Sequence, residues 1–148
     1  MQKISAIIIT KNAQSVLADC LMSVAFCDEI VVVDNGSTDE TIQIAKKHNA
    51  VVVSQKEKDF SLLRNKGKMV AKGQWLFYID ADERVDETLK QAMQKVAEEE
   101  HTDTAAYRIK RKNIYFATHP WPRTEHMVRH IVTGKHFVTG KHDFKWTT

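Results

Sequence analysis

The sequence predicts an α/β protein, a three-layer α/β/α sandwich around an open, mostly parallel sheet. Four short apolar runs lack alternation between polar and apolar residues, which is typical of strands buried on both faces. Segments with the apolar spacing of helices lie between these runs, and each connection is long enough to join parallel strands. Strand and helix therefore alternate along the chain.

The apolar runs and the helical spacing place the elements in order. We expect strands over residues 4–9, 29–34, 50–54 and 75–80. A first helix is expected over residues 15–26, where one face would carry Val16, Leu17, Cys20, Leu21 and Val24. A last helix begins after Asp86, with a predicted core stripe of Leu89, Ala92, Met93 and Val96.

Capping signals place the two middle helices. Ser37 and Glu40 have the spacing of a capping box, which predicts a helix over about residues 38–48. Ser61 is the expected cap of the next helix, and Gly73 is expected to end it.

Composition indicates one globular domain. The chain has 148 residues, 43% hydrophobic and 28% charged, which is ordinary for a folded protein that can bury a sizeable core. Cys20 and Cys27 are expected to be thiols in a reducing compartment, because two cysteines make no disulfide framework. No signal peptide is visible and no apolar run approaches the ~18 residues of a membrane span, so we expect a cytoplasmic protein.

Charge is divided unevenly along the chain. Residues 1–104 carry 13 Lys and Arg against 17 Asp and Glu, whereas residues 105–148 carry 9 against 2. A basic segment of this kind suits a phosphorylated acceptor, nucleic acid or an anionic membrane surface. A solvated basic face explains it equally well.

Polar groups follow three of the predicted strands: TKN (10–12), DNGSTD (34–39) and DAD (80–82). In open parallel sheets ligands bind at these carboxyl ends, so the three groups are expected to form one site. Asp80 and Asp82 would point to the same face in extended backbone, and two carboxylates there suit Mg²⁺ or Mn²⁺. The alternative is an acidic turn that leads into the helix cap at Asp86.

Other polar residues also have two interpretations each. Asp34 can accept hydrogen bonds from a base or ribose, or it can form a turn before Asn-Gly. Arg64 can reach a diphosphate, or it can lie on a solvated helix face. His126 and His130 have the spacing of a metal pair, but no convincing third ligand lies near them. The chain has neither a Walker A loop nor G-x-G-x-x-G, which argues against P-loop and dinucleotide sites.

Four motifs in order, IIITKN, CDEIVVVDNGSTDET, RNKG and GQWLFYIDADERV, resemble the family-2 glycosyltransferases with the GT-A fold. The resemblance is strongest to bacterial enzymes that add glucose to the inner core of lipopolysaccharide or lipooligosaccharide, and it covers about residues 3–112. It implies that residues 1–104 form a Rossmann-like, nucleotide-sugar-binding half. Residues 105–148 would be an incomplete acceptor-side segment of the same domain.

The resemblance implies a donor site for a UDP-sugar. Asp82 would bind a divalent metal, Mg²⁺ or Mn²⁺, which bridges the diphosphate and neutralises the leaving UDP. The other donor residues would be Thr10 and Asn12 in the nucleotide pocket, Asp34 at uracil, Arg64 at the uracil or diphosphate edge, and Asp80 on the ribose side.

The resemblance also implies inversion by in-line displacement, which needs a carboxylate base for the acceptor hydroxyl. The candidates are Asp143 in GKHDF, where Asp replaces the usual Glu, and Glu125 in WPRTEHMVRHI. We favour Asp143 slightly. Because family members usually continue with acceptor-side helices, the resemblance implies that the chain is truncated, split or a degenerate copy.

The expected function is therefore transfer of a hexose, glucose by preference, from a UDP-sugar to a lipopolysaccharide-type core saccharide. The acceptor would be a saccharide or lipid-linked saccharide, met peripherally at the inner membrane face, with no nucleic acid as partner. One alternative is a nucleotide-sugar-binding module without transfer. The other is a nucleotidyltransferase, which usually has a glycine-rich loop where this chain has TKNAQ.

Overall fold

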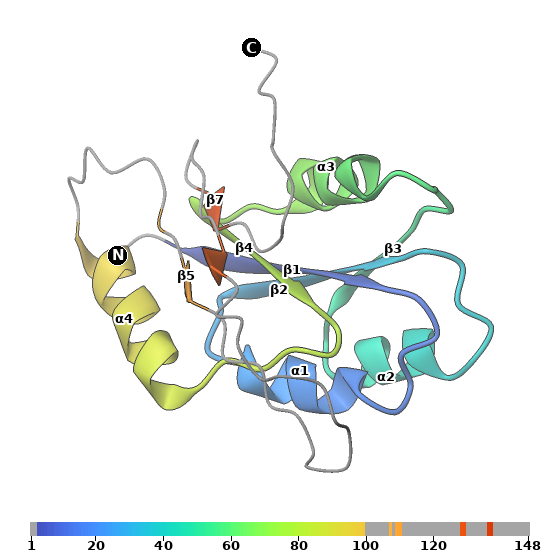
Figure 1. The fold of residues 1–148 in the computed structure, drawn as a ribbon, viewed down its shortest axis with the longest axis horizontal. Coiled ribbons are helices and arrows are strands. Elements are labelled where there is room, and N and C mark those ends of the chain that lie inside the picture. Colours follow the sequence, from blue (N-terminus) through green and yellow to red (C-terminus); the bar gives the residue numbers. More distant parts are fainter. Residues whose placement is uncertain (1–2, 100–106, 108, 111–127, 130–135, 138–148) are drawn as a thin grey trace, which may run out of the picture.

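The computed structural model describes residues 3–99, 107, 109–110, 128–129 and 136–137 (Figure 1). Strands and helices alternate over the first part of the chain as expected. Their bounds are β1 Ile4–Thr10, α1 Leu17–Ser23, β2 Glu29–Asp34, α2 Thr41–Lys47, β3 Val51–Ser54, α3 Phe60–Val70, β4 Trp75–Asp80 and α4 Glu87–Glu98. Three two-residue strands follow: β5 Ile109–Lys110, β6 Val128–Arg129 and β7 His136–Phe137.

The main sheet has the strand order β3-β2-β1-β4-β7, and every neighbouring pair in it is parallel. Strands β5 and β6 form a separate antiparallel pair. The predicted α/β sandwich with an open parallel sheet is confirmed.

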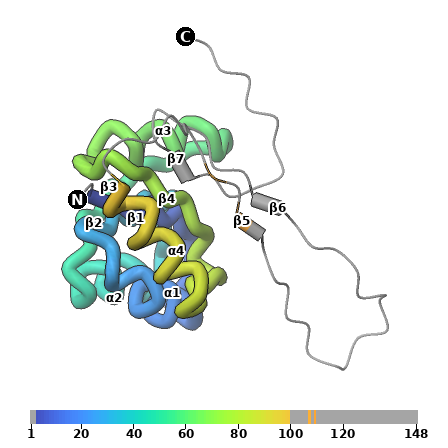
Figure 2. The backbone as a smooth tube through the Cα atoms, turned by 90° about the vertical axis from the view of Figure 1, so that its left-hand side faces the viewer, coloured from blue at the N-terminus to red at the C-terminus, as the bar shows by residue number. Residues whose placement is uncertain are grey.

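Helices cover both faces of this sheet. Figure 2 shows α3 above the strands and α1 and α2 below them. Side chains alternate along β1, so Ala6 and Ile8 pack in the cluster with α1, α2 and α4, whereas Ile7 packs on the α3 side. All three are fully buried. Burial of each large aliphatic side chain is worth about 1.5–3 kcal/mol, which is why apolar runs without alternation form the central strands.

The start of α2 differs from the capping-box prediction. The helix begins at Thr41, and no side chain caps it at Glu40. The Ser37 hydroxyl instead accepts a hydrogen bond from the backbone N–H of Asn12, 2.8 Å away. The hydroxyl that was expected to cap the helix is therefore used to join two loops.

The cap of α3 also differs by two residues. The Asp59 carboxylate accepts a hydrogen bond from the Ser61 N–H at 2.7 Å, so Asp59 is the cap and Ser61 lies inside the helix. Gly73 does not end the helix, because the backbone is already extended at Ala71. A Cβ at Gly73 would lie 2.7 Å from the backbone nitrogen of Ser5, so this glycine lets the backbone run close to β1.

The prediction for α4 was correct at its start and wrong at one core position. Asp86 caps the helix by accepting from the Leu89 N–H at 2.8 Å. Met93 and Ala97 are buried, whereas Ala92 is exposed. Ala97 completes the stripe because it lies one turn beyond Met93 on the same face.

None of the helices in the described part of the chain has the length and apolar character needed to cross a membrane. Cys20 is buried, Cys27 is half-buried, and both are free thiols.

Candidate functional site

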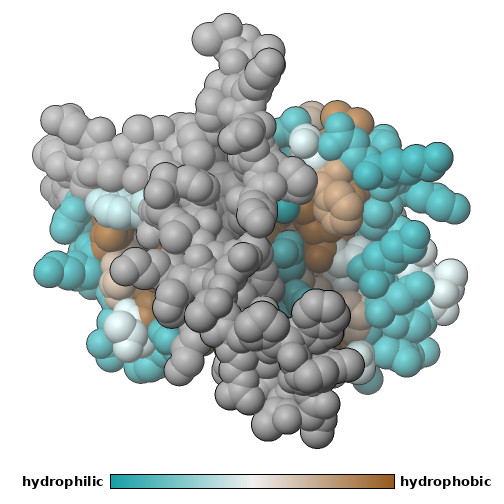
Figure 3. Space-filling model, viewed as in Figure 1, coloured by the Kyte–Doolittle hydropathy of each residue, from teal (hydrophilic) through white to brown (hydrophobic). Residues whose placement is uncertain are grey.

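Strands β1 to β4 end within one residue of the same level. In the parallel register Thr10 lies opposite Asp34, Asp34 lies opposite Ser54, and Ile9 lies opposite Asp80. Hydrophilic side chains dominate the surface at the right-hand edge of Figure 3, where the loops after β1, β2 and β3 lie. The polar residues expected at the carboxyl edge are therefore neighbours in space.

Thr10 and Asp34 are the most buried polar residues of this edge, with 3% and 1% of their surfaces exposed. Oδ2 of Asp34 accepts hydrogen bonds from the N–H groups of Gly36 and Ser37, both at 3.1 Å. Within the described residues, Oδ1 of Asp34 and Oγ1 of Thr10 are buried without a hydrogen-bond partner. Such atoms cost about 1–3 kcal/mol each, so a ligand that donates hydrogen bonds here would relieve that cost.

Asn12 joins the loops after β1 and β2. Its backbone is left-handed, with φ at 49°. The carboxamide oxygen accepts from the Thr38 N–H at 2.8 Å, and the Asn12 N–H donates to Ser37. Asn12 therefore lies at the predicted edge, where it holds the two loops together with its backbone and its carboxamide oxygen.

The acidic residues after β4 gather in one cluster. Carboxylate oxygens of Asp80, Asp82 and Glu83 all lie within 4.8 Å of one another. Asp80 ends the strand and Asp82 lies in the turn that follows. The turn brings the carboxylates together, rather than the strand alternation on which the prediction relied.

Glu83 is a member of this cluster that the sequence analysis did not single out. It forms the turn, because its carboxylate accepts from the Asp80 N–H and its own N–H donates to the Asp80 carbonyl, both at 3.0 Å. These bonds fold the side chain back over Asp80. The spacing of Asp80 and Glu83, three residues apart at a turn, was the signal available in the sequence.

The donor set fits a hard divalent cation. Mg²⁺ prefers carboxylate and water oxygens, and two ligands on opposite sides of it lie about 4.2 Å apart. Carboxylate oxygens within 4.8 Å of one another therefore approach the spacing of ligands around one ion. Asp82 is exposed and Asp80 is half-buried, so the ion would keep room for water or phosphate oxygens.

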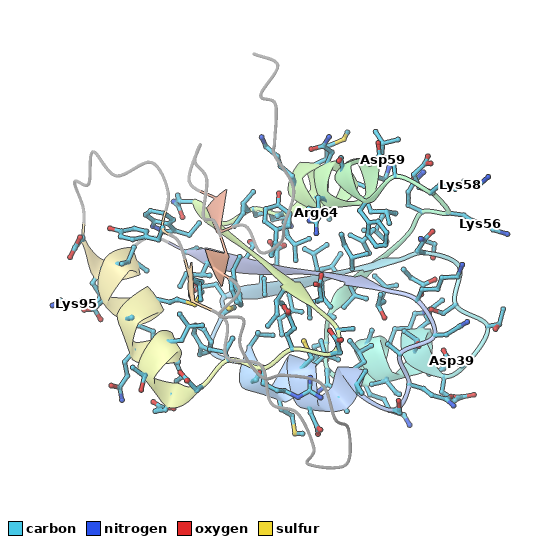
Figure 4. All side chains as sticks on the ribbon, viewed as in Figure 1. Asp39, Lys56, Lys58, Asp59, Arg64 and Lys95 are labelled. Atoms are coloured by element: carbon cyan, nitrogen blue, oxygen red, sulfur yellow. The ribbon has the colours of Figure 1, made fainter. Side chains whose placement is uncertain are left out.

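Arg64 belongs to α3, which covers one face of the sheet. The side-chain alternation of β1 and β2 places Thr10 and Asp34 on the other face. In Figure 4 the Arg64 side chain lies between α3 and the sheet, whereas Lys56 and Lys58 point outward. Burial raises the pKa of Tyr78 to about 12, and the positive charge of Arg64 opposes that rise. Asp80 follows Tyr78 by two residues, so both lie on the α3 side of the sheet.

The Cys20 thiol lies beneath the acidic cluster and donates to the Asp80 carbonyl, with an Sγ–O distance of 3.5 Å. Burial raises its pKa to about 12, Arg84 opposes the rise, and Asp82 and Asp80 add to it. A thiol held protonated in this way serves as packing and is no nucleophile at neutral pH.

The two candidate bases, Asp143 and Glu125, lie outside the described residues, as do His126 and His130. The candidate donor-site residues within the described part of the chain are Thr10, Asn12, Asp34, Arg64, Asp80, Asp82 and Glu83.

Curated relatives share most of this chain. An uncharacterised glycosyltransferase of Rickettsia typhi is 35% identical over 112 residues, which cover 74% of this chain and 38% of the relative. The poly(ribitol-phosphate) β-N-acetylglucosaminyltransferase TarS of Staphylococcus aureus is 33% identical over 126 residues, which cover 76% of this chain and 22% of TarS. The chain thus spans well under half the length of these relatives.

Solved structures show the same fold. The crystal structure of S. aureus TarS 1-349 superposes with a TM-score of 0.56 at 32% identity and covers 64% of this chain and 32% of that one. The complex of TarS 1-349 with UDP superposes with a TM-score of 0.54 at 32% identity. The model of glycosyl transferase family 2 matches residues 5–146, which is nearly the whole sequence. The chain therefore belongs to glycosyl transferase family 2.

Proposed function

We propose that the carboxyl edge of the sheet binds a UDP-sugar together with Mg²⁺ or Mn²⁺, and that the protein transfers the hexose to a saccharide acceptor. The observation that carries this proposal is the pair of buried oxygens without a partner on Thr10 and Asp34, at the same edge of the sheet as a cluster of three carboxylates. A nucleotide and a cation together satisfy both features. The crystallised UDP complex of TarS supports the choice of uridine.

Each residue of the edge has a proposed role in donor binding. Oδ1 of Asp34 accepts a hydrogen bond from the uracil N–H, and its anchored Oδ2 holds the carboxylate in place. Arg64 balances charge on the diphosphate from the α3 side, and Asp80 contacts the ribose. Asp82 and Glu83 hold the cation, which neutralises negative charge on the departing UDP.

Transfer with inversion requires a carboxylate to take the proton of the acceptor hydroxyl, because the neutral hydroxyl is a weak nucleophile. Asp143 is the proposed base and Glu125 the second candidate. The proposed sugar is glucose and the proposed acceptor is a lipid-linked core saccharide of the lipopolysaccharide type, reached at the inner membrane face.

Calorimetric titration with UDP in the presence of Mn²⁺ or of EDTA tests the donor site. Asp34→Asn and Asp82→Asn are each expected to weaken UDP binding with Mn²⁺ by about tenfold or more, which is about 1.4 kcal/mol. Only Asp34→Asn should weaken binding in EDTA. Glu87→Gln removes an exposed carboxylate from α4 and serves as the charge-matched control. Wild-type protein that binds no UDP would refute the donor site.

Product analysis with UDP-glucose and a core saccharide separates transfer from binding alone. We expect a glucosylated product that disappears in Asp143→Asn or in Glu125→Gln. Binding of UDP-glucose without any transfer or hydrolysis would instead support a nucleotide-sugar-binding module.

A further inference from the structure

We propose that Arg84 is a positioning residue for the metal, because it clamps the acidic loop, residues 80–85, onto the start of α1. Its Nη1 donates to the carbonyls of Glu83 at 2.7 Å and Ala81 at 3.3 Å. Its Nη2 donates to the Val16 carbonyl at 2.8 Å and contacts the Asp19 carboxylate at 3.4 Å. This role rests on the proposed function.

These contacts bind the Arg84 side chain to the middle of the loop that carries the carboxylates. The two carbonyls bound by Nη1 flank Asp82, so the backbone on either side of that residue is held by one nitrogen. The Val16 carbonyl belongs to the residue that directly precedes α1. Through this hydrogen bond, Arg84 fixes the acidic loop relative to α1, which contributes no residue to the cluster.

Two weaker contacts continue the attachment along α1. The Val85 N–H donates to the Ser23 hydroxyl at 3.1 Å, and Cys20 donates to the Asp80 carbonyl. Both ends of the acidic loop therefore lie on α1, and Arg84 holds the middle of it.

A guanidinium suits this position better than an ammonium does. It offers five N–H donors in a planar fork and reaches several carbonyls at once, whereas a lysine presents one compact charge. The ion pair with Asp19 is the smaller part of the effect, because the two side chains are 36% and 66% exposed and such pairs are worth about 0–1 kcal/mol. The hydrogen bonds to three carbonyls set the geometry.

Positive charge at the clamp has a second consequence. Three carboxylates within 4.8 Å of one another repel when all are ionised, which opens the cluster. The Arg84 guanidinium is bound to the carbonyls on both sides of Asp82, so its positive charge lies close to the backbone that carries this carboxylate. Loss of the clamp is therefore expected to lower metal affinity by about 10–100-fold, the range found for residues that orient metal ligands.

The test compares Arg84→Lys and Arg84→Gln with Lys90→Gln. Lys90 and Glu87 form an ion pair on α4 with exposures of 35% and 65%, which matches the Arg84–Asp19 pair in exposure. Calorimetry would measure UDP affinity in Mn²⁺ and in EDTA, and thermal melts would follow folding. Asp19→Asn separates the ion pair from the hydrogen bonds to the carbonyls.

We expect both Arg84 variants to lose about 10–100-fold in UDP affinity with Mn²⁺ and nothing in EDTA, whereas Asp19→Asn and Lys90→Gln stay near wild type. Three results would overturn the positioning role. They are a loss of UDP affinity in EDTA as large as the loss in Mn²⁺, wild-type affinity in Arg84→Lys, and unfolding of both Arg84 variants at 25 °C. Absence of UDP binding in the wild-type protein would instead refute the proposed function, and the role of Arg84 with it.

Discussion

Gly67 lets α3 approach the sheet, and Gly67→Ala is expected to force the two apart. A Cβ built at this position would lie 2.4 Å from Cγ2 of Ile7 and 3.1 Å from Cγ2 of Val33. Both partners are completely buried β-branched residues of β1 and β2, so neither methyl can move aside by a simple rotation. The helix itself has to move.

The expected cost is the difference between two opposing terms. Overpacking of a close-packed core costs about 1–3 kcal/mol. Alanine regains up to about 1 kcal/mol through its helix propensity. The contact of 2.4 Å is shorter than any ordinary carbon–carbon approach, so we expect the upper part of the first range and a net loss of about 1–2 kcal/mol.

Urea unfolding of four proteins measures this effect: wild type, Gly67→Ala, Ile7→Ala and the double variant. Removal of the Ile7 methyl makes room for the new Cβ, so the double variant should be more stable than the sum of the single losses predicts, by about 1 kcal/mol or more. Lys68→Ala, an exposed change on the same helix, should stay within about 0.5 kcal/mol of wild type. Unchanged or increased stability of Gly67→Ala would refute the close-approach argument.

Three further predictions concern single side chains. Thr10→Val removes a buried hydroxyl that has no hydrogen-bond partner among the described residues. It should therefore raise the stability of the free protein by about 1 kcal/mol and weaken UDP binding. Thermal melts without and with UDP measure these two effects. Asp59→Ala should cost about 1 kcal/mol in urea unfolding, whereas Ser61→Ala should cost little, because Asp59 is the cap. The Cys20 thiol ionises near pH 8.5 in the unfolded chain and near pH 12 in the folded protein, so the unfolded state binds fewer protons between these two values. The free energy of unfolding should therefore fall by about 1.4 kcal/mol for each pH unit in that window. The Cys20→Ala variant should lack this contribution.

Local signals predicted most of the elements. The apolar runs at residues 29–34 and 75–80 became strands with those same limits, because each run buries both faces and ends in an aspartate. Asp86 was correctly identified as a cap, since its hydrogen bond to Leu89 depends only on residues within one turn. The start of α2 was shifted to residue 41 because the Ser37 hydroxyl binds Asn12 from elsewhere in the chain. The start of α3 was shifted to residue 60 because Asp59, rather than Ser61, caps that helix.

What the sequence by itself determined is the layered α/β architecture and the set of polar residues at the carboxyl edge. Both depend on short-range pattern and on the general geometry of parallel sheets. The tertiary structure decided how those residues are used. Ser37 meets Asn12 across 25 positions, and Arg84 meets Val16 across 68, so no local rule anticipates either contact. The acidic cluster itself is formed by local bonds between Asp80 and Glu83, whereas the contacts of Arg84 with Val16 attach its loop to α1.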